Sequence, residues 1–93
     1  MIFALYGKVD QVLESSVIIN VNNVYYEVFT SNVSEFSLGN FYKVFIKIFI
    51  REDGFLNVGF LTEIEMDLFN NLTSISGIGI KIALNIIKSS DYQ

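Results

Sequence analysis

Two glycines that bracket one apolar residue, Gly77-Ile78-Gly79, form the part of this sequence whose residue types and spacing could do chemistry. Glycine reaches backbone conformations closed to other residues, so the chain can turn sharply here and approach another surface closely. A helical pattern follows, and the first turn of a helix presents free N–H groups at the positive end of its dipole. Lys81 adds a full charge to that turn. The pattern predicts an anion site made by Gly77, Ile78, Gly79 and Lys81. We expect a nucleic-acid phosphate there, because the longer glycine loop of a nucleoside-triphosphate site is absent.

The same spacing also fits a purely structural turn. A Gly-x-Gly sequence between two apolar helices is often only a tight connection, in which Ile78 would fill the core. Spacing alone favours this structural interpretation, and it is the sequence upstream of the turn that favours DNA binding.

Composition excludes several classes of protein. The chain has 93 residues, of which 52% are hydrophobic, enough apolar material for one small domain with or without an appendage. No run approaches the ~20 apolar residues of a membrane span. Residues 1–5 lack the basic leader of a signal peptide, so we expect a cytoplasmic protein with no membrane partner.

The titratable residues argue against an enzyme. With no cysteine and no histidine, the sequence excludes disulfides, thiol catalysis and the usual zinc sites. Glu52 and Asp53 are adjacent carboxylates without a convincing metal partner, so we expect no catalytic residue, no metal and no cofactor. Because the net charge is −4, any DNA binding must be local and geometric rather than a broad electrostatic footprint.

Residues 1–60 are typical of strands. Asn22-Asn23 suits a two-residue hairpin turn, because asparagine tolerates positive φ. Residues 3–9 and 12–14 are shorter strand candidates, with Gly7 as a bend or bulge. The hairpin register places six residues on the core face in three pairs, Val21 with Val24, Ile19 with Tyr26, and Val17 with Val28.

The longest predicted strand covers residues 41–51 and follows a turn with a short helix at residues 30–38. Glu52-Asp53-Gly54 then makes a turn into a returning strand at residues 55–60. About five strands in this length predict a small β-barrel of the OB-fold type. The long strand has one apolar face, which runs from Tyr42 to Ile50, and one face that mixes basic and aromatic residues. Because charged side chains are usually exposed, we expect this basic-aromatic face to be in contact with solvent. It carries Lys43, Phe45, Lys47, Phe49 and Arg51.

Two other functions stay open at this point. OB-fold barrels often bind single-stranded DNA by stacking bases on aromatic rings, here Phe45 and Phe49 with Lys47 beside them. Alternatively, the barrel and the helices that follow form an oligomerisation module that binds no DNA.

Residues 62–93 are typical of helices, so the predicted fold is a barrel at 1–61 followed by an α-helical hairpin at 62–93. Thr62 and Glu65 fit a capping box at the start of the first helix. Two short helices cannot bury their faces alone, so we expect this helical domain to be cut short. The predicted inner faces are Ile64, Leu68, Leu72 and Ile75 with Phe69 in the first helix, and Ile80, Ala83, Leu84 and Ile87 in the second.

The order of these features resembles the RuvA family, the Holliday-junction-binding subunits of bacterial branch-migration complexes. The resemblance covers essentially the whole chain. It is carried by Met1-Ile2, the hairpin that ends in Tyr26-Glu27-Val28, Arg51-Glu52-Asp53 followed by Gly59-Phe60, Leu68-Phe69, and the stretch from Gly77 to Leu84.

The resemblance implies an N-terminal fragment: an OB-fold domain plus the first hairpin of a truncated helix-hairpin-helix DNA-binding domain. It implies structure-specific binding of four-way junction DNA in recombination and repair, self-association to a tetramer, and RuvB and RuvC as partners. RuvB would supply the ATPase motor and bind a region absent from this chain. Turn amides at Gly77 to Lys81 would contact phosphates without reading sequence.

The resemblance also gives the carboxylates a role. The family's acidic pin maps onto Glu52 and Asp53, which would repel phosphates at the junction centre. Arg51 is a weaker candidate for DNA contact. The sequence departs from the family at Asn22-Asn23, where Gly-Gly is common, and at Ile80, where proline often follows the second glycine.

Overall fold

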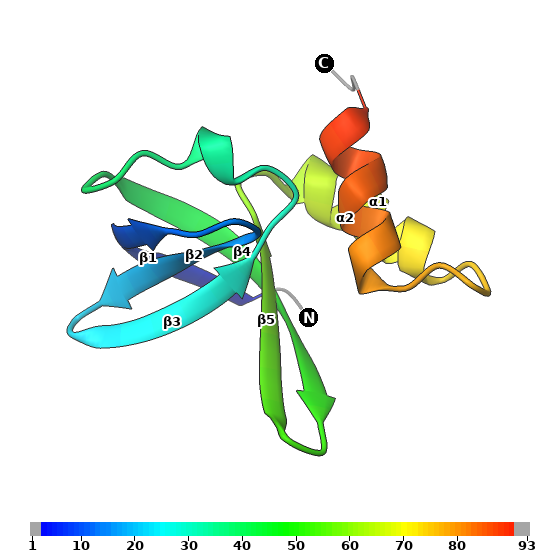
Figure 1. Cartoon of the computed structure of the whole chain (residues 1–93), viewed down its shortest axis with the longest axis horizontal. Helices are drawn as coiled ribbons and strands as arrows, with labels where there is room; N and C mark the ends of the chain where they lie inside the picture. Colours follow the sequence, from blue (N-terminus) through cyan, green and yellow to red (C-terminus); the bar gives the residue numbers. More distant parts are fainter. Residues whose placement is uncertain (1–2, 91–93) are drawn as a thin grey trace.

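The computed structural model describes residues 3–90, which form a closed barrel of five strands followed by two α-helices (Figure 1). Residues 1–2 and 91–93 lie outside the described part of the chain. The first two are Met1-Ile2, which carry part of the family resemblance. The elements are β1 (Phe3–Val12), β2 (Ser16–Val21), β3 (Val24–Phe29), the 3-10 helix η1 (Val33–Glu35), β4 (Phe41–Arg51), β5 (Gly54–Phe60), α1 (Glu63–Thr73) and α2 (Ile80–Ser89).

The strand order around the barrel is β1-β2-β3-β5-β4, and β1 closes it by pairing with β4. Strands β3 and β5 run parallel, through Val28 opposite Asn57 and Phe29 opposite Val58, while the other pairs are antiparallel. A five-stranded closed sheet with a helical turn between its third and fourth strands confirms the predicted OB-type barrel.

The β2–β3 hairpin confirms the predicted turn and register. Asn22 and Asn23 have φ of 51° and 70°, and Val21 pairs with Val24. Val17, Ile19 and Val28 are fully buried. The core-face prediction is wrong only at the rim, where Val24 next to the turn is 52% exposed.

Strand β1 corrects two expectations. It continues to Val12 as one strand, and its register shifts between Val9 and Gln11 rather than at Gly7. Gly7 is required for a steric reason instead, because a Cβ there would lie 2.5 Å from the Asn20 carbonyl oxygen. The glycine therefore permits close approach between β1 and β2, and the bend lies farther along the strand.

Strand β5 separates two cores. A Cβ on Gly59 would lie 2.5 Å from Val28 Cγ1 and 2.7 Å from Val44 Cγ1, so this residue faces the barrel interior. Its neighbours Val58 and Phe60 are completely buried on the opposite face, against the helices. Because side chains alternate along a strand, Gly59 leaves room inside the barrel while its neighbour Phe60 packs against the helices.

The two helices pack on this outer face of the barrel (Figure 1). Thr62 caps α1 as predicted, since its hydroxyl accepts from Glu65 N–H at 3.2 Å. The predicted inner face of α2 is confirmed, with Ala83 and Ile87 buried. That of α1 is wrong at both ends, because Ile64 is 68% exposed and Ile75 is 52% exposed.

The side chains that α1 does bury show that its inner face is rotated from the predicted one. Its deeply buried side chains are Met66 and Phe69 together with Glu65, which belongs to the capping box. The contact with β5 selects the stripe on which Phe69 lies, although the stripe through Ile64 fits helical spacing equally well.

We predict that Gly59→Ala destabilises the barrel by about 1–3 kcal/mol, because the added methyl group overlaps Val28 and Val44 in a packed interior. The measurement is urea unfolding followed by far-UV circular dichroism. Gly79→Ala is the matched control, since a Cβ there meets no atom within 4 Å and the residue has φ of −88°. Equal midpoints for the two variants would contradict the assigned packing.

Candidate nucleic-acid interface

The turn between α1 and α2 has the geometry that its glycines predict. Gly77 has φ of 88°, a left-handed conformation that favours glycine, whereas Gly79 is extended and caps α2 without a side-chain hydrogen bond. Ile78 is partly buried against the core formed by the helices and β5, and its N–H donates to Ile75 O at 3.1 Å. The structural role expected for Ile78 is therefore present.

The start of α2 also keeps its amides available. Ala83 N–H donates to Gly79 O at 3.0 Å, which is the first bond of the helix, so the amides before it have no helical acceptor. Lys81 is exposed in that first turn. Core packing by Ile78 therefore leaves the amides of the same turn available for the anion site that the sequence predicts.

Glu52 and Asp53 lie at the tip of the β4–β5 ribbon, which projects from the barrel (Figure 1). Both are exposed, and Gly54 with φ of 133° completes the turn between Arg51 and Gly54, which are paired. A ribbon that extends past the core cannot bury both faces. Ile50 is accordingly 81% exposed, although strand alternation assigned it to the apolar face.

The basic-aromatic face of β4 is not the solvated face that the sequence favours. Helix α1 covers the middle of this face, while Lys43 and Arg51 at its two ends are exposed. Phe49 meets Phe69 edge-on at 6.1 Å between ring centroids, and Phe45 packs against the same core. Lys47 Nζ donates to Asn70 Oδ1 at 2.8 Å. Phe45 and Phe49 are therefore partly buried against the helices, which leaves less of either ring for a base of single-stranded DNA to stack on.

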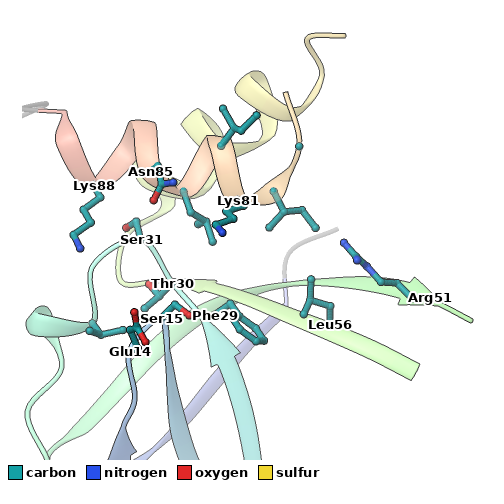
Figure 2. Close-up of a pocket in the computed structure, with 15 residues that line it drawn as sticks. Glu14, Ser15, Phe29, Thr30, Ser31, Arg51, Leu56, Lys81, Asn85 and Lys88 are labelled. Atoms are coloured by element: carbon teal, nitrogen blue, oxygen red, sulfur yellow. The ribbon is translucent and has the colours of Figure 1, made fainter. Parts of the chain in front are cut away.

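A cavity of about 700 Å³ lies between α2 and the barrel (Figure 2). It brings together two predicted residues, Gly79 and Lys81, with Arg51 from the base of the β4–β5 turn. Sequence reasoning missed Asn85 and Lys88, which also line it. Their spacing from Lys81, four and seven residues, was the available signal, because it places all three on one side of a helix.

Two ionisable groups that do not line this cavity have shifted pKa values, namely Glu35 in η1 and Tyr42 in β4. Burial raises the pKa of Glu35, and the nearby Glu65 carboxylate raises it further. The pKa of Tyr42 is lowered, because its oxygen accepts a hydrogen bond from Ser37 N–H at 2.8 Å.

Residues 3–90 contain no cluster of acidic residues that could hold a metal ion. No helix in the same range is long and apolar enough to cross a membrane.

A closed OB-type barrel that carries two helices with a glycine turn between them defines an OB-fold protein with a helical hairpin. Residues 1–56 match the RuvA N-terminal domain, and the chain belongs to that family. It is 44% identical over 91 residues to the Holliday junction branch migration complex subunit RuvA of Rickettsia typhi, an alignment that covers 96% of this chain and 46% of the relative.

A second relative, the protein of the same name from Rickettsia felis, is 42% identical over an alignment that covers the whole chain and 48% of the relative. The chain therefore spans about half the length of the curated relatives it matches.

We predict that Phe49→Ala lowers the free energy of unfolding by about 3 kcal/mol, because it removes a ring that packs against Phe69. Phe41→Ala is the control, since its ring is 57% exposed and stacks on the surface with Tyr6. Thermal unfolding of the three proteins compares them. Phe49→Ala with unchanged stability would mean that the β4 face is open to solvent.

Proposed function

We propose that this chain binds four-way DNA junctions by their shape, as part of a RuvA subunit of a branch-migration complex. The observation that carries the proposal is its 42–45% identity to proteins named Holliday junction branch migration complex subunit RuvA. The exposed, positively charged first turn of α2 supports it physically.

Phosphate binding at the glycine turn would use Gly77, Ile78, Gly79 and Lys81. The amides at the start of α2 point away from the helix toward an incoming anion, and Lys81 adds a charge-assisted contact. These contacts touch the DNA backbone rather than base edges, so they recognise shape and not sequence. Such recognition suits a protein that must act at any junction.

The acidic turn would supply discrimination. Glu52 and Asp53 are exposed at the end of a projecting ribbon, where their charges would meet phosphates first. Like charges that face one another cost free energy, so a duplex that crosses the tip is disfavoured relative to an open junction with a central gap. We therefore assign the two carboxylates the role of an acidic pin.

The same proposal extends to organisation and partners. We assign residues 1–61 to the barrel and residues 62–93 to the start of a helix-hairpin-helix domain. The complete protein would form a tetramer, bind the RuvB ATPase motor and meet RuvC on the junction in the cytoplasm, with no catalysis of its own. A tetramer would raise the affinity of weak single-hairpin contacts through multivalency.

We predict that Lys81→Ala weakens binding to a labelled four-way junction roughly three- to tenfold at low salt, because one phosphate contact is lost. The salt dependence of the affinity, plotted on logarithmic axes, should become shallower by about 0.9. Fluorescence anisotropy with junction, linear duplex and single strand measures both effects.

Lys43→Ala is the matched control, because it removes one exposed lysine on β4 far along the chain from the turn. We expect its junction affinity to stay within about twofold of the parent. If the two variants lost the same amount of junction affinity, the binding would depend on overall charge and not on a local site at Lys81. Similar affinity for all three DNAs would favour single-strand binding, and absence of binding to any of them would contradict the proposal for this chain.

The pin makes a separate prediction. Glu52→Gln with Asp53→Asn should raise affinity for linear duplex roughly fivefold, corresponding to about 1 kcal/mol of removed repulsion, and raise junction affinity less. The preference for the junction therefore falls. Asp10→Asn with Asp67→Asn removes two exposed charges elsewhere and should leave the preference unchanged. A gain shared equally by duplex and junction would rule out a pin.

A further inference from the structure

Two aromatic rings stack on each other at the outer surface of strands β1 and β4. Tyr6 is 65% exposed and Phe41 is 57% exposed. Their ring centroids lie 5.7 Å apart, and the ring planes make an angle of 22°. Neither ring packs against either of the two cores. The pair therefore presents a flat apolar surface that the fold of the described residues leaves open.

Lysines alternate with these rings across the strand pair. Tyr6 lies opposite Lys43, and Lys8 lies opposite Phe41. Because side chains alternate along a strand, all four residues share the outer face, and the two rings are diagonal neighbours within reach of each other. We call these four residues the Tyr6/Phe41 face. Both of its lysines are exposed, and Lys43 Nζ lies 5.3 Å from the ring centroid of Phe45 farther along β4.

The Tyr6/Phe41 face is basic although the chain as a whole is acidic. It holds two of the six basic residues in a chain of net charge −4. The residue that pairs with Lys8 on β2 is the neutral Asn20, and Asp10 lies farther along β1, beyond the part that pairs with β4. A polyanion that also carries flat apolar groups complements this face in charge and in shape.

The amide beside the face is already engaged within the β2–β3 hairpin. Asn20 Nδ2 donates to the Tyr25 hydroxyl at 3.3 Å, and Asn20 Oδ1 accepts from Asn23 N–H at 2.8 Å. Asparagine reads adenine in DNA through these same two amide atoms. A nucleic acid on this face would therefore be held by stacking and charge, with little preference for sequence.

The mixture of rings and lysines favours a nucleic acid over a protein partner. The centres of protein–protein interfaces are depleted in lysine, whereas here each ring has a lysine directly opposite it. Surfaces that bind single strands combine aromatic rings, on which bases stack, with positive charge along the backbone.

We propose that the Tyr6/Phe41 face binds a single strand of DNA. A base stacks on the exposed side of the ring pair, and the ammonium groups of Lys8 and Lys43 meet neighbouring phosphates. Stacking and charge need no sugar hydroxyl, so a deoxyribose strand suffices. In a double helix the bases already stack on one another, so a duplex offers this face only its phosphates.

This inference goes beyond the proposed function and does not need it. None of the four residues lies in the glycine turn, at the acidic tip of the ribbon or in the cavity beside α2. The site also differs from single-strand binding at Phe45 and Phe49, whose rings pack partly against the helices.

The test is an amide-resolved nuclear magnetic resonance titration of the ¹⁵N-labelled chain with oligo(dT) of about 12 nucleotides at low salt. We expect one saturable set of shifts centred on residues 5–8 and 41–43. An abasic oligonucleotide and a blunt duplex of the same length keep the phosphates and offer no unstacked base. Each should therefore bind this face at least about fivefold more weakly.

Variants tie the binding to the rings. Phe41→Leu and Tyr6→Leu keep an apolar side chain but remove the ring, so each should weaken oligo(dT) binding roughly five- to tenfold. Phe41→Tyr keeps a ring and should stay within about twofold of the parent. Phe55→Leu is the matched control, because Phe55 is 73% exposed on β5 outside the face, and its affinity should be unchanged. The amide spectrum of each variant verifies that it is folded.

The lysines make a separate contribution that salt reveals. Lys8→Gln with Lys43→Gln should make the salt dependence of oligo(dT) affinity, on logarithmic axes, shallower by about 1.4, because each phosphate contact with a single strand contributes about 0.7. An unchanged slope would remove the two lysines from the site.

The proposal is overturned if oligo(dT) gives no saturable shifts, if the abasic strand binds equally well, or if Phe41→Leu and Phe55→Leu have equal affinities. Sedimentation of the free chain at several concentrations adds one outcome. Self-association that Phe41→Leu abolishes would make a second copy of the chain the occupant and overturn the assignment to DNA. Junction binding that fails while oligo(dT) binds removes the proposed function and leaves this face standing.

Discussion

The contact between Phe60 of β5 and Phe69 of α1, with ring centroids 5.1 Å apart, is the interaction on which the arrangement of the chain depends. It joins the outer face of β5 to the helices in the second of the two cores, which also contains Val58, Met66 and Ile87. Because α1 is fixed there, the turn after it and helix α2 have one position relative to the barrel. The cavity and the location of the glycine turn both follow from that position.

This contact exists because glycine and phenylalanine alternate on β5. Gly59 faces the barrel interior, where a methyl group would overlap Val28 and Val44, while Phe60 faces outward and is fully buried by the helices. Five strands leave little room inside a closed barrel, so the smallest residue stands where strands approach most closely. The large side chain next to it then has only the outer face available.

Features set by neighbouring residues could be predicted from the sequence. The Asn22-Asn23 turn, the bounds of β4, the Thr62 cap and the inner face of α2 depend on local backbone geometry and alternation, and the structure has them all.

Features set by distant contacts could not be predicted. The exposure of Ile64 depends on which stripe of α1 meets β5, and the cover over Phe49 depends on where α1 docks. The cavity is lined by residues from distant parts of the chain, from Glu14 to Lys88, so no local sequence pattern predicts it. At the candidate site, the sequence predicted the glycine turn and gave Arg51 as a weaker candidate, but it predicted neither that Arg51 lines one cavity with Lys81 nor that Asn85 does.

The glycine turn shows why a structural and a functional interpretation need not compete. Ile78 packs into the helical core and so holds the turn in one conformation, while the amides that follow Gly79 stay unpaired at the surface. A phosphate that binds there meets donors already in position, so little conformational entropy is lost on binding. In a chain of net charge −4, long-range attraction to DNA is weak, so the proposed affinity for DNA would have to come from such fixed geometry. The apolar residue between the glycines would thus help the proposed anion site by fixing its conformation, although it would touch no anion.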